Sequence, residues 1–277
     1  MFKFHLEVLF HIIGIGSASG LVYKDNSVFV ISDNGGYLYE YHLENNTFDR
    51  IPLFENSTTE NIHKAIKPDF EAITHFENDY YIFGSGSTEN RNRMVKYNSE
   101  TKALKTVDLT NLYLSMQGFG SIAPEDFNIE GVVFNGQTWY FFQRGNGKNG
   151  INGIFTVQGK NLENDFTILF NSYKLPKIKG IRSSFTDAVL DGDKLWFLSC
   201  AENSPSTYDD GEVLGSFIGC INKKTMKLEG MQKISDHHKF EGITVYKKTE
   251  YRMEFLLCED NDTEKLESDI YRLILPN

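Results

Sequence analysis

A short sequence unit recurs five times along the chain and sets the size of the element that the protein repeats. Each copy opens with a polar residue followed by Gly or Ala, runs through a short apolar stretch and a turn, and reaches a second stretch rich in aromatic residues. The copies open at Ser19, Glu71, Glu130, Asp187 and Glu241, which lie 52 to 59 residues apart. A repeat of this length, built from short strands, predicts one four-stranded blade of a β-propeller per copy.

The strand count predicts that five blades close into a ring. Two further strand-like stretches follow in the first copy, at 37–43 and 47–53, whereas the fifth copy carries only one, at 270–275. Apolar residues alternate around 4–11, ahead of the first copy, which indicates a strand without a blade of its own. We therefore predict an all-β protein, a single five-bladed propeller domain over residues 1–277, whose N-terminal strand completes the fifth blade.

Composition agrees with a β fold and argues against two kinds of partner. The 22 Phe and 14 Tyr favour pleated strands, and the apolar fraction of 40% supplies a core. A net charge of −10 argues against nucleic acid, which needs a basic face. No apolar run is long enough to span a membrane. Cys200, Cys220 and Cys258 lie in or beside expected strands, which favours buried free thiols.

The N-terminal segment does not look like a signal peptide, because it lacks a basic start, an unbroken apolar stretch and a small-residue cleavage site. The compartment stays open on this reasoning, with the cytoplasm slightly favoured. We expect a monomer.

The polar residues that open the copies are expected to meet on the propeller axis, because the first strand of each blade lines the central channel. Four of the five are carboxylates, and at about 5 Å and an effective dielectric of about 20 each ionised pair costs about 3 kcal/mol. Protons, backbone N–H donors or a cation would offset this repulsion. Calcium, which takes about 6–8 oxygen ligands, suits the set best, and magnesium is the second choice. Zinc fits poorly, since no His or Cys recurs. Alternatively, these residues only cap strand ends by hydrogen bonds between blades.

The repeat resembles the soluble calcium-activated nucleotidases, the animal apyrases. That family consists of five-bladed propellers with one axial calcium, held by Ser from the first and fourth blades and Glu from the second, third and fifth. The matching positions here are Ser19, Glu71, Glu130 and Glu241. The chain departs from the family in the fourth blade, where Asp187 takes the slot, shortly after Ser183 and Ser184.

Two further stretches support the resemblance, and one points elsewhere. Residues 32–39, SDNGGYLY, are similar to the acidic loop of the family's first blade, and 139–144, WYFFQR, to its aromatic third-blade strand that ends in arginine. The loop 84–87, followed by Arg91 and Arg93, looks more like bacterial propellers of uncharacterised, phytase-like or esterase-like type. The resemblance implies the fold and the ion, whereas the loops that would set the substrate do not match.

The candidate catalytic residues lie in loops on the face that bears the acidic ring. Arg91, Arg93 and Arg144 are candidates to clamp a phosphate beside the divalent ion. Asp33 or a histidine would deprotonate a calcium-bound water that attacks phosphorus. Other polar residues expected on this face are Asp69, Asp126, Lys148, Arg182, Glu202, Asp209, Asp210, His237, His238 and Asp260.

These residues predict a calcium-dependent hydrolase of nucleotides or other phosphoesters, acting on a small molecule at the acidic face. The alternative is a non-catalytic platform with a purely structural calcium, which binds a peptide, a glycan or a small ligand; its acidic segment 202–212 would then be a lid or a partner contact. For any single arginine, a loop charge paired with an acid is the simpler interpretation. Arginines within reach of the ion across an open funnel would favour the enzyme.

Overall fold

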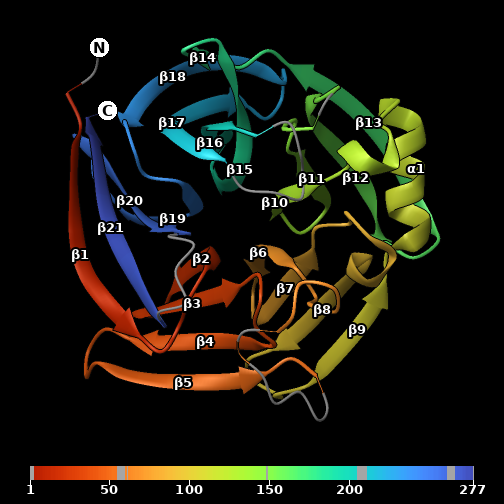
Figure 1. Ribbon diagram of the computed structural model, residues 1–277. Helices are drawn as coiled ribbons and strands as arrows, with labels where there is room; N and C mark the ends of the chain where they lie inside the picture. The colour runs from red at the N-terminus through yellow and green to blue at the C-terminus, as the bar shows by residue number, and fades with distance from the viewer. Residues whose placement is uncertain are drawn as a thin grey trace.

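Five antiparallel sheets stand around a central axis, as the predicted five-bladed propeller requires (Figure 1). The computed structural model describes residues 3–54, 60, 62–147, 149–204, 211–260 and 266–276. The innermost strands of the five sheets are neighbours in sequence order around the axis, and the last also neighbours the first, so that the ring is closed. The predicted fold class is confirmed.

Each blade contains four strands that follow one another from the axis outward. Blade one consists of β2 (Ala18–Lys24), β3 (Ser27–Ser32), β4 (Tyr37–His42) and β5 (Thr47–Pro52). Blade two consists of β6 (Phe70–Phe76), β7 (Asp79–Gly84), β8 (Arg93–Asn98) and β9 (Leu104–Asp108). Blade three consists of β10 (Ile129–Phe134), β11 (Thr138–Gln143), β12 (Asn152–Asn161) and β13 (Asp165–Tyr173). Blade four consists of β15 (Ile181–Asp191), β16 (Lys194–Asn203), β17 (Glu212–Asn222) and β18 (Lys227–Ser235). Blade five consists of β19 (Phe240–Lys248), β20 (Arg252–Glu259), β21 (Glu267–Pro276) and β1 (His5–Ile13).

The N-terminal strand completes blade five, as predicted. β1 pairs antiparallel with β21, from His5 opposite Ile274 to Ile13 opposite Glu267. The two ends of the described chain therefore lie side by side on the outer edge of one blade (Figure 1). This pairing joins the first and last segments of the ring and covers the edge that β21 would otherwise expose.

Aromatic side chains fill the spaces between blades. Trp139 of β11 packs edge-to-face against Tyr81 and Phe83 of β7, with ring centroids 5.0 and 5.7 Å apart. Gly131 shows why a small residue recurs on the inner strands: a Cβ there would lie 3.0 Å from the backbone nitrogen of Ala188 in the next blade. The repeated Gly or Ala thus lets neighbouring inner strands approach closely.

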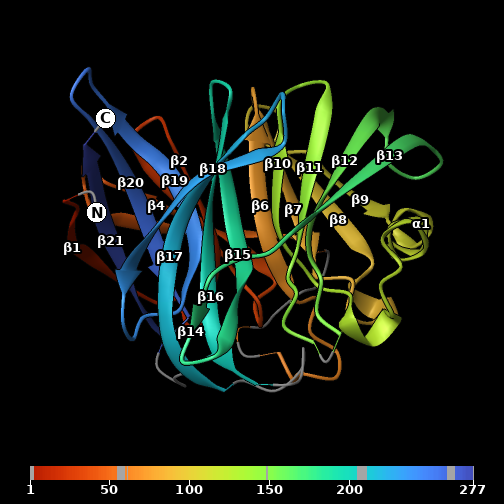
Figure 2. The same ribbon diagram turned by 90° about the horizontal axis from the view of Figure 1, so that it is seen from above.

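Four additional elements depart from the simple repeat. An α-helix, α1 (Thr110–Gly120), and two short 3₁₀ helices, η1 (Glu89–Arg91) and η2 (Pro124–Asp126), lie in the connections of blades two and three. Blade four carries an extra strand, β14 (Lys177–Ile178), which forms a hairpin with the start of β15. This hairpin lies near the bottom of Figure 2. Among the described residues no helix is both long and apolar enough to cross a membrane. The three cysteines are buried and unpaired, as predicted.

Candidate functional site

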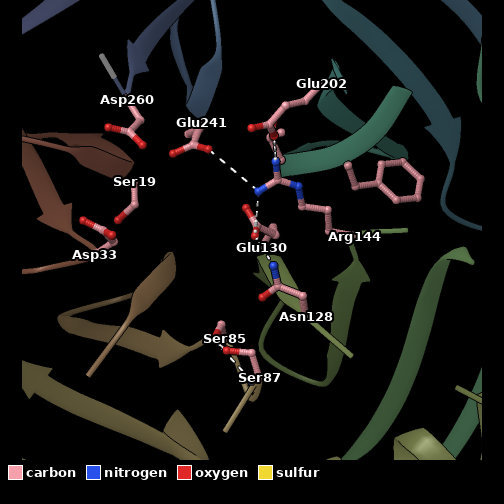
Figure 3. Close-up of polar contacts among 12 residues, drawn as sticks. Ser19, Asp33, Ser85, Ser87, Asn128, Glu130, Arg144, Glu202, Glu241 and Asp260 are labelled. Atoms are coloured by element: carbon pink, nitrogen blue, oxygen red, sulfur yellow. Dashed lines mark hydrogen bonds and ion pairs between the residues drawn. The ribbon is translucent and has the colours of Figure 1, made fainter. Parts of the chain in front are cut away.

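A β-bulge marks the point where the inner strands enter the channel. In blade one, Ala18 pairs with Ser32 and Gly20 with Ile31, which leaves Ser19 between them without a partner on β3. In blades two, three and five the same register shift leaves one residue without a partner on the adjacent strand: Glu71, Glu130 and Glu241. Ser19, Glu130 and Glu241 turn their side chains into the same central space (Figure 3). The predicted convergence on the axis therefore rests on a bulge that re-aims one side chain per blade.

The fourth position of the ring is Thr186 and not the predicted Asp187. Phe185 pairs with Ser199 and Asp187 with Leu198, so that Thr186 is the bulged residue. Asp187 instead occupies the position that is Gly or Ala in the other blades. Its Oδ2 accepts a hydrogen bond of 2.8 Å from the backbone N–H of Ile243 in blade five. Asp187 is thus a cap between inner strands, the alternative that the sequence left open for the whole ring.

The two hydroxyl residues of the ring are oriented alike. Ser19 Oγ donates to the carbonyl oxygen of Phe70 at 2.5 Å, and Thr186 Oγ1 donates to that of Phe240 at 2.7 Å. Each of these carbonyls belongs to the residue just before the ring glutamate of the next blade. Because the proton is used in this bond, the lone pairs of each hydroxyl remain available as acceptors.

Carboxylates outnumber cations around the channel. Four cationic side chains contact seven carboxylates or lie beside them, which leaves three carboxylates in excess. The carboxylates are Asp33, Asp69, Glu71, Glu130, Glu202, Glu241 and Asp260, and the cations are Lys67, Arg91, Arg144 and Lys239. Neutralisation within the described chain is therefore incomplete.

Arg144 ties the acids of blades three and four together and approaches the acid of blade five. Its Nη1 donates to Glu130 Oε1 at 3.1 Å and lies 4.0 Å from Glu241 Oε1, and its Nη2 donates to Glu202 Oε2 at 2.5 Å (Figure 3). Lys239 lies 3.1 Å from Glu241 Oε1. Burial opposes the charge of Lys239, yet the neighbouring carboxylates hold its pKa well above the usual value. Arg144 and Lys239 thus offset the negative charge of the carboxylates in one half of the channel.

The other half holds a compact group of three acids. Asp33, Asp69 and Glu71 each offer a carboxylate oxygen, and these oxygens lie within 4.8 Å of one another. Lys67 pairs with Asp33 and, at 2.9 Å, with Asp69 Oδ1, and Arg91 Nη1 donates to Asp69 Oδ2 at 2.8 Å. Asp33 Oδ1 is buried and has no hydrogen-bond partner among the described residues. The group therefore contains a carboxylate oxygen whose burial no contact compensates.

Glu71 is the least compensated member of the group. Within the described part of the chain its carboxylate accepts no hydrogen bond and forms no ion pair. Burial, together with the charges of Asp69 and Glu130, raises its pKa well above the usual value of a glutamate. Burial also raises the pKa of Asp33, Glu130 and Glu241. A positive charge near Glu71 would relieve this cost.

The predicted catalytic residues do not form one group. Arg91 and Arg144 reach axial carboxylates and are buried in ion pairs, and Asp33 pairs with Lys67. Arg93 makes none of these contacts: it opens β8 opposite Asp108, and its guanidinium lies 5.9 Å from the centre of the Phe54 ring. The 3₁₀ helix η1 ends at Arg91, so two arginines close in sequence point to different surroundings.

Neither histidine candidate forms a hydrogen bond or an ion pair with Asp33 among the described residues. His238 Nδ1 is 2.6 Å from Glu259 Oε2, and the His238 ring packs near Phe240 and Tyr271. Lys148 and residues 205–210, which include Asp209, Asp210 and the middle of the acidic segment 202–212, lie outside the described residues.

Two channel lysines escaped the sequence reasoning, although a signal was present. Lys67 precedes Glu71 by four residues and Lys239 precedes Glu241 by two; Lys239 directly precedes Phe240, whereas Lys67 lies three residues before Phe70. A cation shortly before a ring acid is what an internal counter-charge requires.

A cavity of about 450 Å³ opens beside Arg144 and Glu202, between the β11–β12 loop, the β14–β15 hairpin and the end of β16. It shares Arg144 and Glu202 with the channel, so that the axial acids and an open, polar space adjoin each other.

Fold and site define this protein as a five-bladed β-propeller with an acidic axial channel. The family model DUF6929, described as a family of unknown function, matches residues 14–275, and the chain belongs to this family. No curated protein matches the sequence.

Among solved structures, similar folds occur in two enzymes. The PQQ-bound aldose sugar dehydrogenase of Streptomyces coelicolor is 12% identical, with a TM-score of 0.54 and coverage of 99% of this chain and 98% of that one. The glutaminyl cyclase of Myxococcus xanthus is 10% identical, with a TM-score of 0.53 and coverage of 98% and 97%. At these identities the likeness concerns the fold alone.

Proposed function

We propose that the protein binds a divalent cation of the calcium class in the axial channel and acts there as a hydrolase of a small phosphate ester. The observation that carries the cation is the group Asp33, Asp69 and Glu71, whose oxygens lie within 4.8 Å of one another. The orphaned Asp33 Oδ1 and the unpartnered Glu71 carboxylate fit such an ion. Asp33 then serves as a ligand, a different role from the proton acceptor that the sequence suggested.

The donor chemistry favours calcium over the transition metals. The ring offers only hard oxygen atoms, from carboxylates and from the hydroxyls of Ser19 and Thr186, which keep their lone pairs free. With Thr186 in the fourth slot, the ring contains hydroxyl residues in blades one and four and glutamates in the other three. The calcium-activated nucleotidases that the sequence resembles carry Ser in blades one and four and Glu in the other three, so a ring with Thr186 in the place of the fourth-blade Ser is similar to theirs and supports the proposal.

The cavity beside Arg144 favours an enzyme over an inert platform. Arg144 contacts the axial acid Glu130 and also lines the open space of about 450 Å³. That volume lies within the range of about 300–1,000 Å³ typical of small-molecule sites. A bound divalent ion would act as a Lewis acid on a phosphoryl oxygen. Arg144 would orient the ester, and Glu130 and Glu202 hold the Arg144 side chain in place.

The experiment is calorimetric titration of calcium into the metal-free protein, followed by an assay of phosphate release from a panel of nucleotides and simple phosphoesters. Glu71→Gln should weaken calcium binding by about tenfold or more, because it removes one charged ligand. Glu44→Gln, in the exposed turn between β4 and β5, is the matched control and should bind as the wild type does. Release should require calcium. Absence of calcium binding refutes the whole proposal, whereas binding without release from any ester leaves the non-catalytic platform.

A further inference from the structure

The cavity beside the channel is electropositive in an otherwise acidic protein. Among the described residues that line it, three are cations and Glu202 is the one acid, while the carboxylate of Asp126 lies behind Gly147. Glu202 is already engaged by Arg144 Nη2 and by the backbone N–H of Gly211, at 2.5 and 2.7 Å. The cations are Arg144, Lys177 and Arg182. The chain as a whole has a net charge of −10, so this local reversal of sign calls for a specific cause.

The extra hairpin of blade four places two of these cations opposite each other. Lys177 of β14 and Arg182 of β15 are direct cross-strand partners. Like charges in that relation are destabilising. Neither forms an ion pair with any residue that the structure describes, and the one hydrogen bond of the Arg182 side chain goes to the carbonyl oxygen of Gly150 at 3.3 Å. An anion between them would remove this repulsion.

The opposite wall of the cavity is formed by a glycine-rich segment that exposes its backbone. Residues 144–147 and 149–151 pack so tightly against each other that a Cβ on Gly150 would lie 2.0 Å from the carbonyl oxygen of Gly145. The N–H groups of Asn146 and Gly147 donate no hydrogen bond to any described residue. Free N–H groups in a glycine-rich turn are suited to an oxyanion.

We propose that this cavity is the anchoring subsite for the phosphate group of the substrate, bound by Lys177, Arg182 and the free N–H groups of 146–147. Several donors on different elements suit a dianion with three terminal oxygens better than a carboxylate. Arg144 lies between this subsite and the axial acids, so the remainder of the molecule extends along Arg144 toward the channel. The choice of phosphate rests on the proposed function, whereas the anion subsite itself does not.

The test is calorimetric titration of inorganic phosphate into the full chain in the presence of a chelator, so that no divalent ion takes part. Lys177→Gln and Arg182→Gln should each weaken phosphate binding by about tenfold, since each removes a charge-assisted contact. Lys179→Gln is the matched control, because Lys179 is an exposed lysine of the same hairpin turn that does not line the cavity. Equal melting temperatures would show that all variants are folded.

Two further arms separate this inference from the proposed function. Glu71→Gln, which should lose calcium, should keep its affinity for phosphate in chelator. Phosphate binding without calcium binding in the wild type would support the subsite and refute the axial ion, and calcium binding without phosphate binding would do the reverse. Succinate is the carboxylate probe: if it binds as tightly as phosphate, the assignment to phosphate is wrong. Equal binding by the wild type and the Arg182→Gln variant would also overturn the inference.

Discussion

The carboxylate of Glu71 faces Asp69 and Glu130 and forms no direct ion pair with any described residue, and burial together with these acids raises its pKa well above the ordinary 4.5. The folded protein therefore holds the Glu71 proton more tightly than the unfolded chain does. Folding takes up a proton in the pH range between the ordinary and the raised pKa, and stability is lost as the pH rises through that range. A bound cation would reverse this penalty.

We accordingly expect Glu71→Gln to melt higher than the wild type at pH 7 in chelator, by about 2 °C for each kcal/mol of relieved repulsion. The difference should shrink as the pH falls below 4.5, where the wild-type carboxyl becomes protonated in both states. Calcium should raise the melting temperature of the wild type and leave that of the variant nearly unchanged. Differential scanning calorimetry checks all three outcomes, and a variant that melts lower in chelator at pH 7 would contradict the electrostatic account.

At the scale of the element, the bulge at the start of each inner strand decides which side chain enters the ring. The repeat in the sequence revealed five blades and four of the ring positions, because polar residues followed by Gly or Ala recur at blade-length spacing. In blade four, Asp187 and Ala188 have the residue types of that pair, but the bulge falls one position earlier, at Thr186. Spacing cannot settle such a case, since the pairing with the adjacent strand sets the position of a bulge. One local signal was available: Thr186 follows Phe185 as Glu71 follows Phe70.

The same limit explains what else the sequence left undetermined. Lys177 and Arg182 come together through a hairpin that, in the part of the chain that the structure describes, is found in blade four alone, so no comparison between repeats predicts it. Arg93 was grouped with Arg91 because the two are close in sequence, but the backbone between them changes from a 3₁₀ helix to a strand. Repeated features could be predicted, whereas features of a single blade could not.

The corrected register gives a test at this scale. Thr186→Val removes the oxygen that the ring would offer to calcium and keeps the shape of the side chain, so we expect calcium affinity to fall by about tenfold. Asp187→Ala, which introduces the residue that blade two carries at this position, should leave calcium affinity unchanged. Calorimetric titration of both variants measures the difference. If Asp187→Ala loses calcium and Thr186→Val does not, the bulged residue is not the ligand.

At the scale of the whole molecule, the pairing of β1 with β21 joins the two ends of the described chain within blade five, and it closes the ring together with the contact between the inner strands β19 and β2. Each inner strand has an inner-strand neighbour on both sides, so strain in blade five reaches the channel through Glu241 on β19. The pairing of β1 with β21, the seam of the ring, therefore contributes to the geometry of the site as well as to stability.

Leu6, opposite Leu273 in this pairing, allows the seam to be weakened by a single substitution. Leu6→Pro removes the backbone N–H of a strand residue and fixes its φ, and a backbone substitution of this kind costs about 1–3 kcal/mol. For a chain of this size we expect the melting temperature to fall by about 2–6 °C, with weaker calcium binding because Glu241 is less firmly placed. Lys3→Pro, just outside β1 on an exposed residue, is the control and should change neither quantity. If both proline variants melt like the wild type, then closure by the N-terminal strand contributes little to stability, and the ring must be held by the contacts between inner strands alone.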